Sequence, residues 1–142
     1  MANMTPMTKA AAPFHPLLDA DQLAELARQA LVAEAELTPK PGLVDRRGSG
    51  AHSDLSLDIM RRSASAIAPY FAAMAAVSCI APMDRSLRAE VAAIGREAEA
   101  AMLRETGGSN AHKGAIWVLG LLATATAQSE KRRSTGRRAT TT

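Results

Sequence analysis

The sequence contains little cysteine and few aromatic residues, and both shortages restrict the kind of protein it can be. Its one cysteine, Cys79, cannot form an internal disulfide, which excludes a disulfide-stapled fold and favours a reducing, cytoplasmic compartment. Cys79 lies in an apolar run, so we expect it in the core, together with Met74. Aromatic side chains make up only 3% of the 142 residues, so alanine, leucine and methionine must fill the interior. Because alanine and leucine favour helices, the composition predicts a single all-α domain.

A basic surface is missing from most of the chain. The net charge is +3, but residues 130–142 hold five basic and one acidic side chain, a local charge of +4. The other 129 residues hold 12 basic and 13 acidic side chains, which leaves a net charge of −1. A nucleic-acid partner is therefore not expected for the folded part, and a helical module that binds nucleic acid through its basic tail is the weakest alternative. Residues 1–16 do not have the pattern of a signal peptide.

A strongly hydrophobic run is absent as well. Residues 64–83 contain no charged side chain over twenty positions, which is the length that spans a bilayer. The stretch is mostly alanine and serine and includes two prolines, so its hydrophobicity is low. We therefore expect a buried core helix here and no contact with a membrane.

Apolar residues at helical spacing organise most of the chain into one multi-helix, bundle-like domain over residues 19–128. Residues 1–18 are predicted to be flexible, and the basic residues 129–142 are predicted to form a disordered tail. The first helix is predicted over residues 21–37, after a capping box that begins at Asp19.

Cap and proline positions define the second and third helices. The second is predicted to follow a cap at Ser53 or Asp54, and Pro69 predicts a kink or a break inside it. The third is predicted to begin at Asp84 or Ser86 and to end at a pair of glycines.

The fourth predicted helix follows Asn110, and residues 111–122 are apolar nearly all round. This pattern is typical of a central, buried helix, which needs more neighbours than three flanking helices supply. The sequence changes character abruptly after Gln128, as expected for a truncated or frame-shifted end. We therefore expect the N-terminal half of a larger helical enzyme.

A loop at residues 38–54 is the first of two stretches that concentrate reactive side chains. Pro41 pushes Lys40 out of the helical region, and three glycines admit conformations closed to other residues. Long structured loops in small domains are usually functional. Arg46 and Arg47 can clamp a phosphate or remain solvated. The loop brings together cations, carboxylates and an imidazole: Lys40, Asp45, Arg46, Arg47, His52 and Asp54.

The second stretch, residues 106–114, leads into the fourth helix through Gly107 and Gly108. Free N–H groups and the helix dipole favour an anion at such a start. Lys113 adds a positive charge there, and Asn110 can donate a hydrogen bond to a phosphate oxygen. The spacing excludes a Walker A motif, and ordinary helix capping is the alternative explanation.

Carboxylates and imidazoles near these stretches are candidates for metal binding and proton transfer. Asp45, Asp54 and Asp58 offer the hard oxygen ligands that suit magnesium accompanied by a nucleotide's phosphates. The alternative is that Asp54 only caps a helix and Asp58 is a solvated acid. His52 and His112 each have acids or lysines close in sequence, which favours a catalytic or ligand role. The alternative is that both are surface imidazoles.

Three segments occur in the order that is typical of a known family: residues 40–45 (Lys-Pro-Gly-Leu-Val-Asp), 50–54 (Gly-Ala-His-Ser-Asp) and 107–116 (Gly-Gly-Ser-Asn-Ala-His-Lys-Gly-Ala-Ile). Together they resemble the signature of the triphosphoribosyl-dephospho-CoA synthase family. Residues 57–63 (Leu-Asp-Ile-Met-Arg-Arg-Ser) are most similar to the branch associated with malonate decarboxylase; the other main branch serves citrate lyase. The resemblance covers residues 23–127, which match the N-terminal half of family members. The sequence departs from the pattern at Ser56, where we expect many relatives to carry an acid.

The resemblance implies an all-helical enzyme that transfers the triphosphoribosyl group of ATP to the ribose 2′-hydroxyl of 3′-dephospho-CoA and releases adenine. The product is the precursor of a prosthetic group that is later attached to a serine of an acyl-carrier subunit. For the triphosphate, the resemblance implies contacts from Lys40, Arg46, Gly107, Gly108, Asn110 and Lys113. For a Mg²⁺ ion it implies Asp54 and Asp58. The candidate acids and bases are His52, Asp45, Asp54 and His112.

Two further expectations concern the chain as a whole. The main alternative to an active enzyme is a truncated, catalytically inactive helical remnant or interaction fragment. An apolar fourth helix without its full set of neighbours also predicts self-association through exposed apolar surface.

Overall fold

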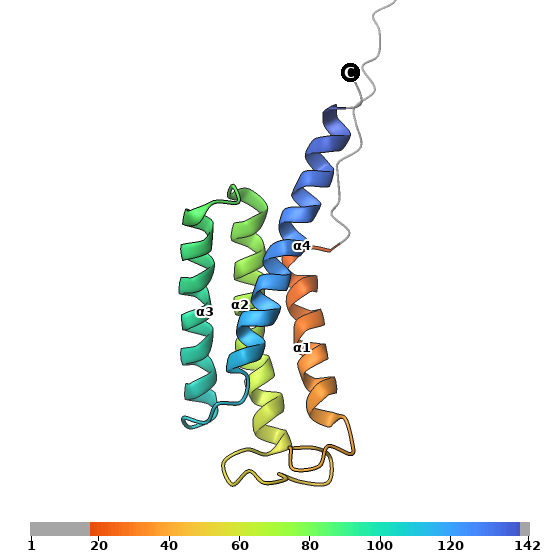
Figure 1. The fold of residues 1–142 in the computed structure, drawn as a ribbon, viewed down its shortest axis with the longest axis vertical. Coiled ribbons are helices and arrows are strands. Elements are labelled where there is room, and N and C mark those ends of the chain that lie inside the picture. Colours follow the sequence, from red (N-terminus) through yellow and green to blue (C-terminus); the bar gives the residue numbers. More distant parts are fainter. Residues whose placement is uncertain (1–17, 140–142) are drawn as a thin grey trace, which may run out of the picture.

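The structure, a computed structural model, describes residues 18–139, which form four α-helices and no strand. The helices are α1 (Ala20–Glu36), α2 (Leu57–Ile80), α3 (Arg85–Glu105) and α4 (Lys113–Ala139). They run alternately down and up along one long axis (Figure 1). The all-α prediction is confirmed. The predicted flexible segment 1–18 lies, except for its last residue, outside the described residues.

Side-chain caps fix where three of the helices begin. The predicted capping box at α1 is present: Gln22 N donates to Asp19 Oδ1 at 2.8 Å, and Asp19 N donates to Gln22 Oε1 at 2.9 Å. Asp84 caps α3 by accepting from Leu87 N at 3.0 Å. The cap of α2 is Ser56, whose Oγ accepts from Ile59 N at 3.3 Å. The caps predicted for α2 at Ser53 or Asp54 were wrong, because the helix begins only at Leu57, directly after Ser56.

Helix α2 lies at the centre of the bundle and packs against the other three helices. Its buried face carries the largest core side chains, Ile67, Phe71 and Met74. Of the predicted kink or break at Pro69, the break does not occur, because this proline lies on the exposed face, where water can solvate the carbonyl that loses its hydrogen bond. Cys79 is exposed near the end of α2, so its predicted place in the core was wrong.

Helix α2 is also the one helix in residues 18–139 that is long and apolar enough to cross a membrane by length and composition. In this structure it serves as the core helix that was predicted for residues 64–83. A buried helix of a globular bundle meets the same criterion, so the match is weak evidence for a membrane span.

Helix α4 differs from its prediction in two ways. It packs mainly on α2 and only lightly on α1 and α3, so large apolar side chains remain exposed on it: Val118, Leu121 and Leu122. It also continues to Ala139, through most of the segment predicted as a disordered tail; residues 140–142 lie outside the described residues.

Two side chains of α4 explain why the helix continues past residue 128. Gln128 Nε2 donates to the carbonyls of Ser78 and Ala81 at 2.6 and 3.0 Å. Lys131 Nζ donates to Ile80 and Ala81 carbonyls at 3.1 and 2.7 Å. Both satisfy carbonyl groups at the C-terminal end of α2, where a positive charge is favoured by the helix dipole.

Candidate functional site

The two stretches with reactive side chains lie at the same end of the bundle. The loop between α1 and α2 covers residues 37–56, and the turn between α3 and α4 covers residues 106–112. Figure 1 shows both at the bottom of the bundle, although α2, α3 and the turn between them separate the two stretches in sequence. The up-and-down topology accounts for this, since it brings every second connection to the same end.

Asp45 holds the loop in its shape. Its side chain is buried and accepts hydrogen bonds from Lys40 N at 2.9 Å, from Arg47 N at 2.8 Å and from Arg47 Nε at 3.0 Å. The Arg47 side chain, followed by the backbone N–H of Lys40, keeps the pKa of Asp45 far below its usual range. Asp45 is therefore ionised and already bound on both oxygens, which is the arrangement of an organising carboxylate.

Gly50 allows the loop to fold back on itself. Its φ is +61°, and a Cβ there would lie 2.5 Å from the carbonyl oxygen of Leu43. A backbone hydrogen bond holds the two sides of the loop together: Ala51 N donates to the Gly42 carbonyl at 3.0 Å. Only glycine fits such a close backbone approach in the left-handed region.

Two acids at the end of α1 bind the cations of the loop. Lys40 Nζ donates to the Glu34 carbonyl at 2.6 Å and to Glu34 Oε1 at 2.9 Å, and the Lys40 side chain is only 12% exposed. Glu36 pairs with Arg46 at 2.8 Å and with Arg61 of α2 at 2.6 Å. Hydrogen bonds, first from Arg61 and then from Arg46, lower the pKa of Glu36.

Sequence reasoning missed both of these acids. A signal was available, because acidic side chains in the last turn of a helix face the negative end of its dipole. Glu34 and Glu36 occupy the last turn of α1, which has no basic residue, so compensating cations had to come from elsewhere.

The Gly-Gly turn before α4 is a helix terminator for α3. Gly107 and Gly108 have φ values of +66° and +99°, and Gly108 N donates to the Leu103 carbonyl at 2.8 Å, as in a Schellman motif. Asn110 Oδ1 accepts from Lys113 N at 3.0 Å. These groups therefore have the capping role that was the alternative to phosphate binding, and the Gly108 N–H is already used.

Lys113 and Arg46 are the predicted phosphate ligands with the most accessible side chains. The Lys113 side chain is 58% exposed and lies 3.6 Å from Glu99 Oε2, while the Arg46 side chain is 64% exposed. Glu99 also accepts a hydrogen bond from Trp117 Nε1 at 2.5 Å. Both cations therefore remain open to an incoming anion.

His112 is buried where α4 begins, and it contacts a residue that sequence reasoning did not select. Its Nδ1 lies 2.8 Å from Ser63 Oγ of α2, and its Nε2 is buried without a hydrogen-bond partner. Burial lowers the pKa of His112, and the nearby Glu34 carboxylate opposes this only in part. The predicted alternative of a surface imidazole is wrong for His112, which is 5% exposed.

Ser63 ends the segment 57–63 but was not selected as a site residue. Besides that segment, its signal is a hydroxyl on the buried stripe of α2, four residues before Ile67. Glu34 lies within electrostatic range of His112 and is bonded to Lys40. Glu34 is thus bonded to the loop and lies near the start of α4.

His52 and Asp54 form the accessible part of the loop. His52 Nδ1 lies 3.9 Å from Asp54 Oδ1, and the Asp54 carboxylate is exposed. Asp58 is exposed as well and lies 3.5 Å from Arg62 Nε. In residues 18–139, no three His, Cys, Asp or Glu side chains converge on a potential metal position. The exposed carboxylates of Asp54 and Asp58 are the type of ligand that Mg²⁺ prefers. Two of them are enough, because this ion takes its other ligands from phosphates and water.

The chain is similar to a known group of enzymes. Residues 20–142 match the sequence model of the family described as ATP:dephospho-CoA triphosphoribosyl transferase (CitG). A probable 2-(5″-triphosphoribosyl)-3′-dephosphocoenzyme-A synthase of Azotobacter vinelandii is 57% identical over 114 residues, which are 80% of this chain and 39% of that protein. The 2-(5″-triphosphoribosyl)-3′-dephosphocoenzyme-A synthase of Klebsiella pneumoniae is 51% identical over 115 residues, 81% of this chain and 41% of that protein.

The matched region is the N-terminal part of these relatives, so the chain spans about two fifths of their length. No solved structure matches the chain. The matching region contains both reactive stretches and all four helices up to Ala139. By its sequence, the chain belongs to the ATP:dephospho-CoA triphosphoribosyl transferase family.

Proposed function

We propose that this protein takes part in transfer of the triphosphoribosyl group of ATP to the ribose 2′-hydroxyl of 3′-dephospho-CoA, with release of adenine. The observation that carries the proposal is that the two family motifs lie at the same end of the bundle (Figure 1). This end presents cations and an acid–base pair to solvent, which a reaction between a triphosphate and a hydroxyl requires.

The proposed reaction exchanges one bond at the ATP ribose. The bond from the ribose carbon to adenine breaks, and the 2′-hydroxyl oxygen of dephospho-CoA forms a new bond to the same carbon. The hydroxyl gives up a proton, and adenine leaves with one. Positive charge develops on the ribose as the first bond loosens, so nearby carboxylates stabilise the transition state.

We assign the proton transfer to His52, with Asp54 beside it. His52 is half-buried and adjacent to an exposed carboxylate, so a substrate hydroxyl can reach it. The Asp54 charge stabilises the imidazolium that forms when His52 accepts the proton. His112 lies deeper and burial lowers its pKa, so we do not assign the proton transfer to it.

We assign the triphosphate to Arg46 and Lys113, whose side chains are the accessible ones. Lys40 is already bonded to Glu34 within the protein and is less accessible. Magnesium belongs to this proposal as the ion that neutralises the triphosphate, with Asp54 and Asp58 as its protein ligands.

The finer proposal is that the product serves the acyl carrier of malonate decarboxylase, supported by the resemblance of residues 57–63. A cytoplasmic location fits a pathway that uses ATP and a CoA precursor.

Adenine release tests the proposal. ATP, 3′-dephospho-CoA and Mg²⁺ are incubated with the chain, with the chain plus the remaining part of the Azotobacter relative, and with that part alone. The proposal expects adenine only where residues 38–54 and 106–114 are supplied, with strong loss in His52→Gln and Asp54→Asn and none in Asp21→Asn, a matched exposed acid on α1. Adenine release that is unchanged by His52→Gln contradicts the assignment.

A second candidate function is favoured by the short match to the relatives. Because the chain spans about two fifths of their length, it can be an inactive helical remnant or an interaction fragment of the enzyme. The same assay separates the two, since an inactive remnant releases no adenine alone or with the added part.

A further inference from the structure

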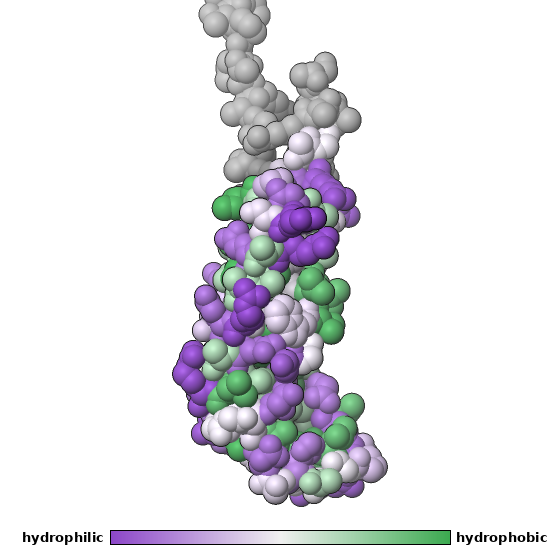
Figure 2. All heavy atoms as spheres, turned by 60° about the vertical axis from the view of Figure 1, so that its left-hand side comes forward, coloured by the Kyte–Doolittle hydropathy of each residue, from purple (hydrophilic) through white to green (hydrophobic). Residues whose placement is uncertain are grey.

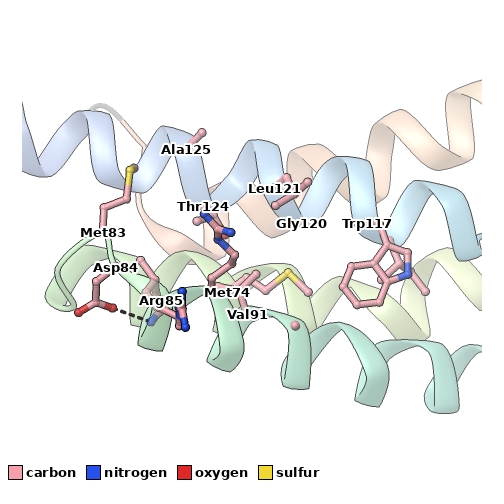
Figure 3. A pocket seen from close by; sticks show the side chains of 14 residues that line it. Met74, Met83, Asp84, Arg85, Val91, Trp117, Gly120, Leu121, Thr124 and Ala125 are labelled. Atoms are coloured by element: carbon pink, nitrogen blue, oxygen red, sulfur yellow. Dashed lines mark hydrogen bonds between the residues drawn. The ribbon is translucent and has the colours of Figure 1, made fainter.

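An apolar groove lies between α3 and α4, on a part of the molecule that the proposed reaction does not use. It has a volume of about 570 Å³. Figure 3 shows Met74 of α2 on its floor, Trp117 at one end, and Met83 with Asp84 at the other. The groove exists because α3 and α4 both pack on α2 and touch each other only lightly.

Apolar surface continues from the groove along α4. Leu121 lines the groove, and Val118 and Leu122 follow it on neighbouring positions of the helix surface, each more than half exposed. Figure 2 shows hydrophobic side chains on this side of the molecule gathered in patches between charged ones. A small molecule in the groove would leave Val118 and Leu122 in water, so the occupant has to be longer than the groove.

Polar groups around the groove specify the occupant further. The Thr124 hydroxyl lies in the groove wall, is buried, and has no hydrogen-bond partner. Arg85 and Arg88 line the rim, and within residues 18–139 neither forms an ion pair. An apolar stripe flanked by acids complements this surface, and such a stripe is what an amphipathic helix presents.

We propose that the α3–α4 groove is the seat of an amphipathic helix from the remaining part of the family fold, with its apolar stripe on Leu121 and its acids beside Arg85 and Arg88. The relatives carry about three fifths of their length outside the region matched here, which is enough chain to supply such a helix. Within residues 18–139, the groove and the adjoining surface of α4 together offer such a helix a continuous apolar face. The inference rests on family membership and not on the catalytic assignment.

The test supplies the occupant as a separate chain. The full chain is labelled with 5-fluorotryptophan, which reports on Trp117 alone because it is the one tryptophan present. It is mixed with the unlabelled C-terminal part of the Azotobacter relative, and binding is followed by co-purification and by the fluorine resonance. Leu121→Glu and the double variant Arg85→Glu/Arg88→Glu are compared with Leu26→Glu, which changes a leucine of similar exposure on α1 (49% against 59%).

We expect a complex that shifts the Trp117 resonance, with affinity reduced about tenfold or more by Leu121→Glu and unchanged by Leu26→Glu. Arg85→Glu/Arg88→Glu should weaken the complex and make it less sensitive to salt. A complex that leaves Trp117 unshifted, or that forms equally with Leu121→Glu, overturns the proposal. So does the absence of a complex, or a self-association through this face that the added part fails to displace. None of these readouts depends on adenine release, so a failed catalytic assignment leaves the test intact.

Discussion

Ser63 and His112 form the contact with the greatest chemical consequence at the scale of single residues. Both side chains are buried, and the hydrogen bond between Ser63 Oγ and His112 Nδ1 joins the middle of the core to the start of α4. It also restricts the ring to one orientation, which leaves Nε2 as the only ring nitrogen open to another partner. Ser63 is thus a positioning residue for an imidazole of the family motif.

Ser63→Ala should destabilise the protein by about 1–3 kcal/mol, because His112 Nδ1 then joins Nε2 as a buried atom without a partner. Urea unfolding gives the free energy, and the ¹⁵N resonances of the His112 ring report the change of tautomer or orientation. Ser65→Ala is the matched control, since its exposed hydroxyl donates only to the Arg61 carbonyl of its own helix. Equal effects of the two substitutions would show that the Ser63 contact does not position the ring.

The burial of His112 predicts a pH dependence of stability. Its pKa in the folded state lies below the usual 6.5, because burial disfavours the charged ring. The unfolded chain therefore binds more protons between the two values, and stability rises with pH in that window. The contribution is complete above pH 6.5 and is lost as pH falls toward the folded pKa, with a slope of up to about 1.4 kcal/mol per pH unit.

Urea unfolding between pH 7.5 and pH 5 measures this slope, and the His112 ring protons give the folded pKa by NMR. His52→Gln should retain the slope, because His52 is neither deeply buried nor part of the core. A His112 ring that titrates at or above pH 6.5 would contradict the account.

At the scale of helices, the closest approach between α3 and α4 is set by a glycine. A Cβ at Gly95 would lie 2.8 Å from two ring carbons of Trp117. This space lets the indole lie flat enough on α3 for its N–H to reach Glu99, which in turn lies near Lys113. The position of the start of α4 therefore depends on one missing side chain in α3.

Gly95→Ala should cost about 1–3 kcal/mol, despite the better helix propensity of alanine, because the new methyl group overlaps the indole ring. The emission of Trp117 should also change as the ring is displaced from Glu99. Gly114→Ala is the control: nothing lies within 4 Å of a Cβ there, so the substitution is neutral or stabilises by up to about 1 kcal/mol. A neutral Gly95→Ala would mean that α4 is not held against α3 at this point.

How much of the structure could be predicted follows from the range of each interaction. Caps act over three residues, so Asp19 and Asp84 could be predicted from the sequence, as could the glycine end of α3. The cap at Ser56 was missed because Ser53 and Asp54 offer the same local signal and only tertiary packing chooses between them. The contact of Ser63 with His112 spans 49 positions and has no local signature.

In the candidate site, too, local features could be predicted from the sequence and long-range contacts could not. The loop and the α4 start were selected from their residue types, and the topology brings them to one end as required. The partners of each charge were not predictable, because Glu36 bridges Arg46 of the loop and Arg61 of another helix. Several cations chosen for phosphate binding turn out to have partners inside the protein, Lys40 most of all.

At the scale of the whole molecule, charge and apolar surface are unevenly distributed. Residues 130–142 carry a net charge of +4 on an otherwise nearly neutral chain. Helix α4, which holds the first ten of them, continues beyond the ends of the other helices (Figure 1). The same helix exposes Val118, Leu121 and Leu122 nearer its start. Helix α4 thus carries the exposed apolar side chains that favour self-association, and the basic residues that oppose it follow in the same helix.

We therefore predict that the chain alone self-associates weakly and that salt strengthens the association, because salt screens repulsion between the basic ends while apolar contact persists. Sedimentation velocity over a range of concentrations at low and high salt measures this directly. Leu121→Glu should shift the population toward monomer with a change in unfolding free energy of no more than about 0.5 kcal/mol, since the side chain is already exposed. Leu26→Glu should leave the association as it is. A monodisperse monomer at every concentration and salt would mean that α4 tolerates water on its apolar face, and the case for a covering helix would then depend on the binding experiment alone.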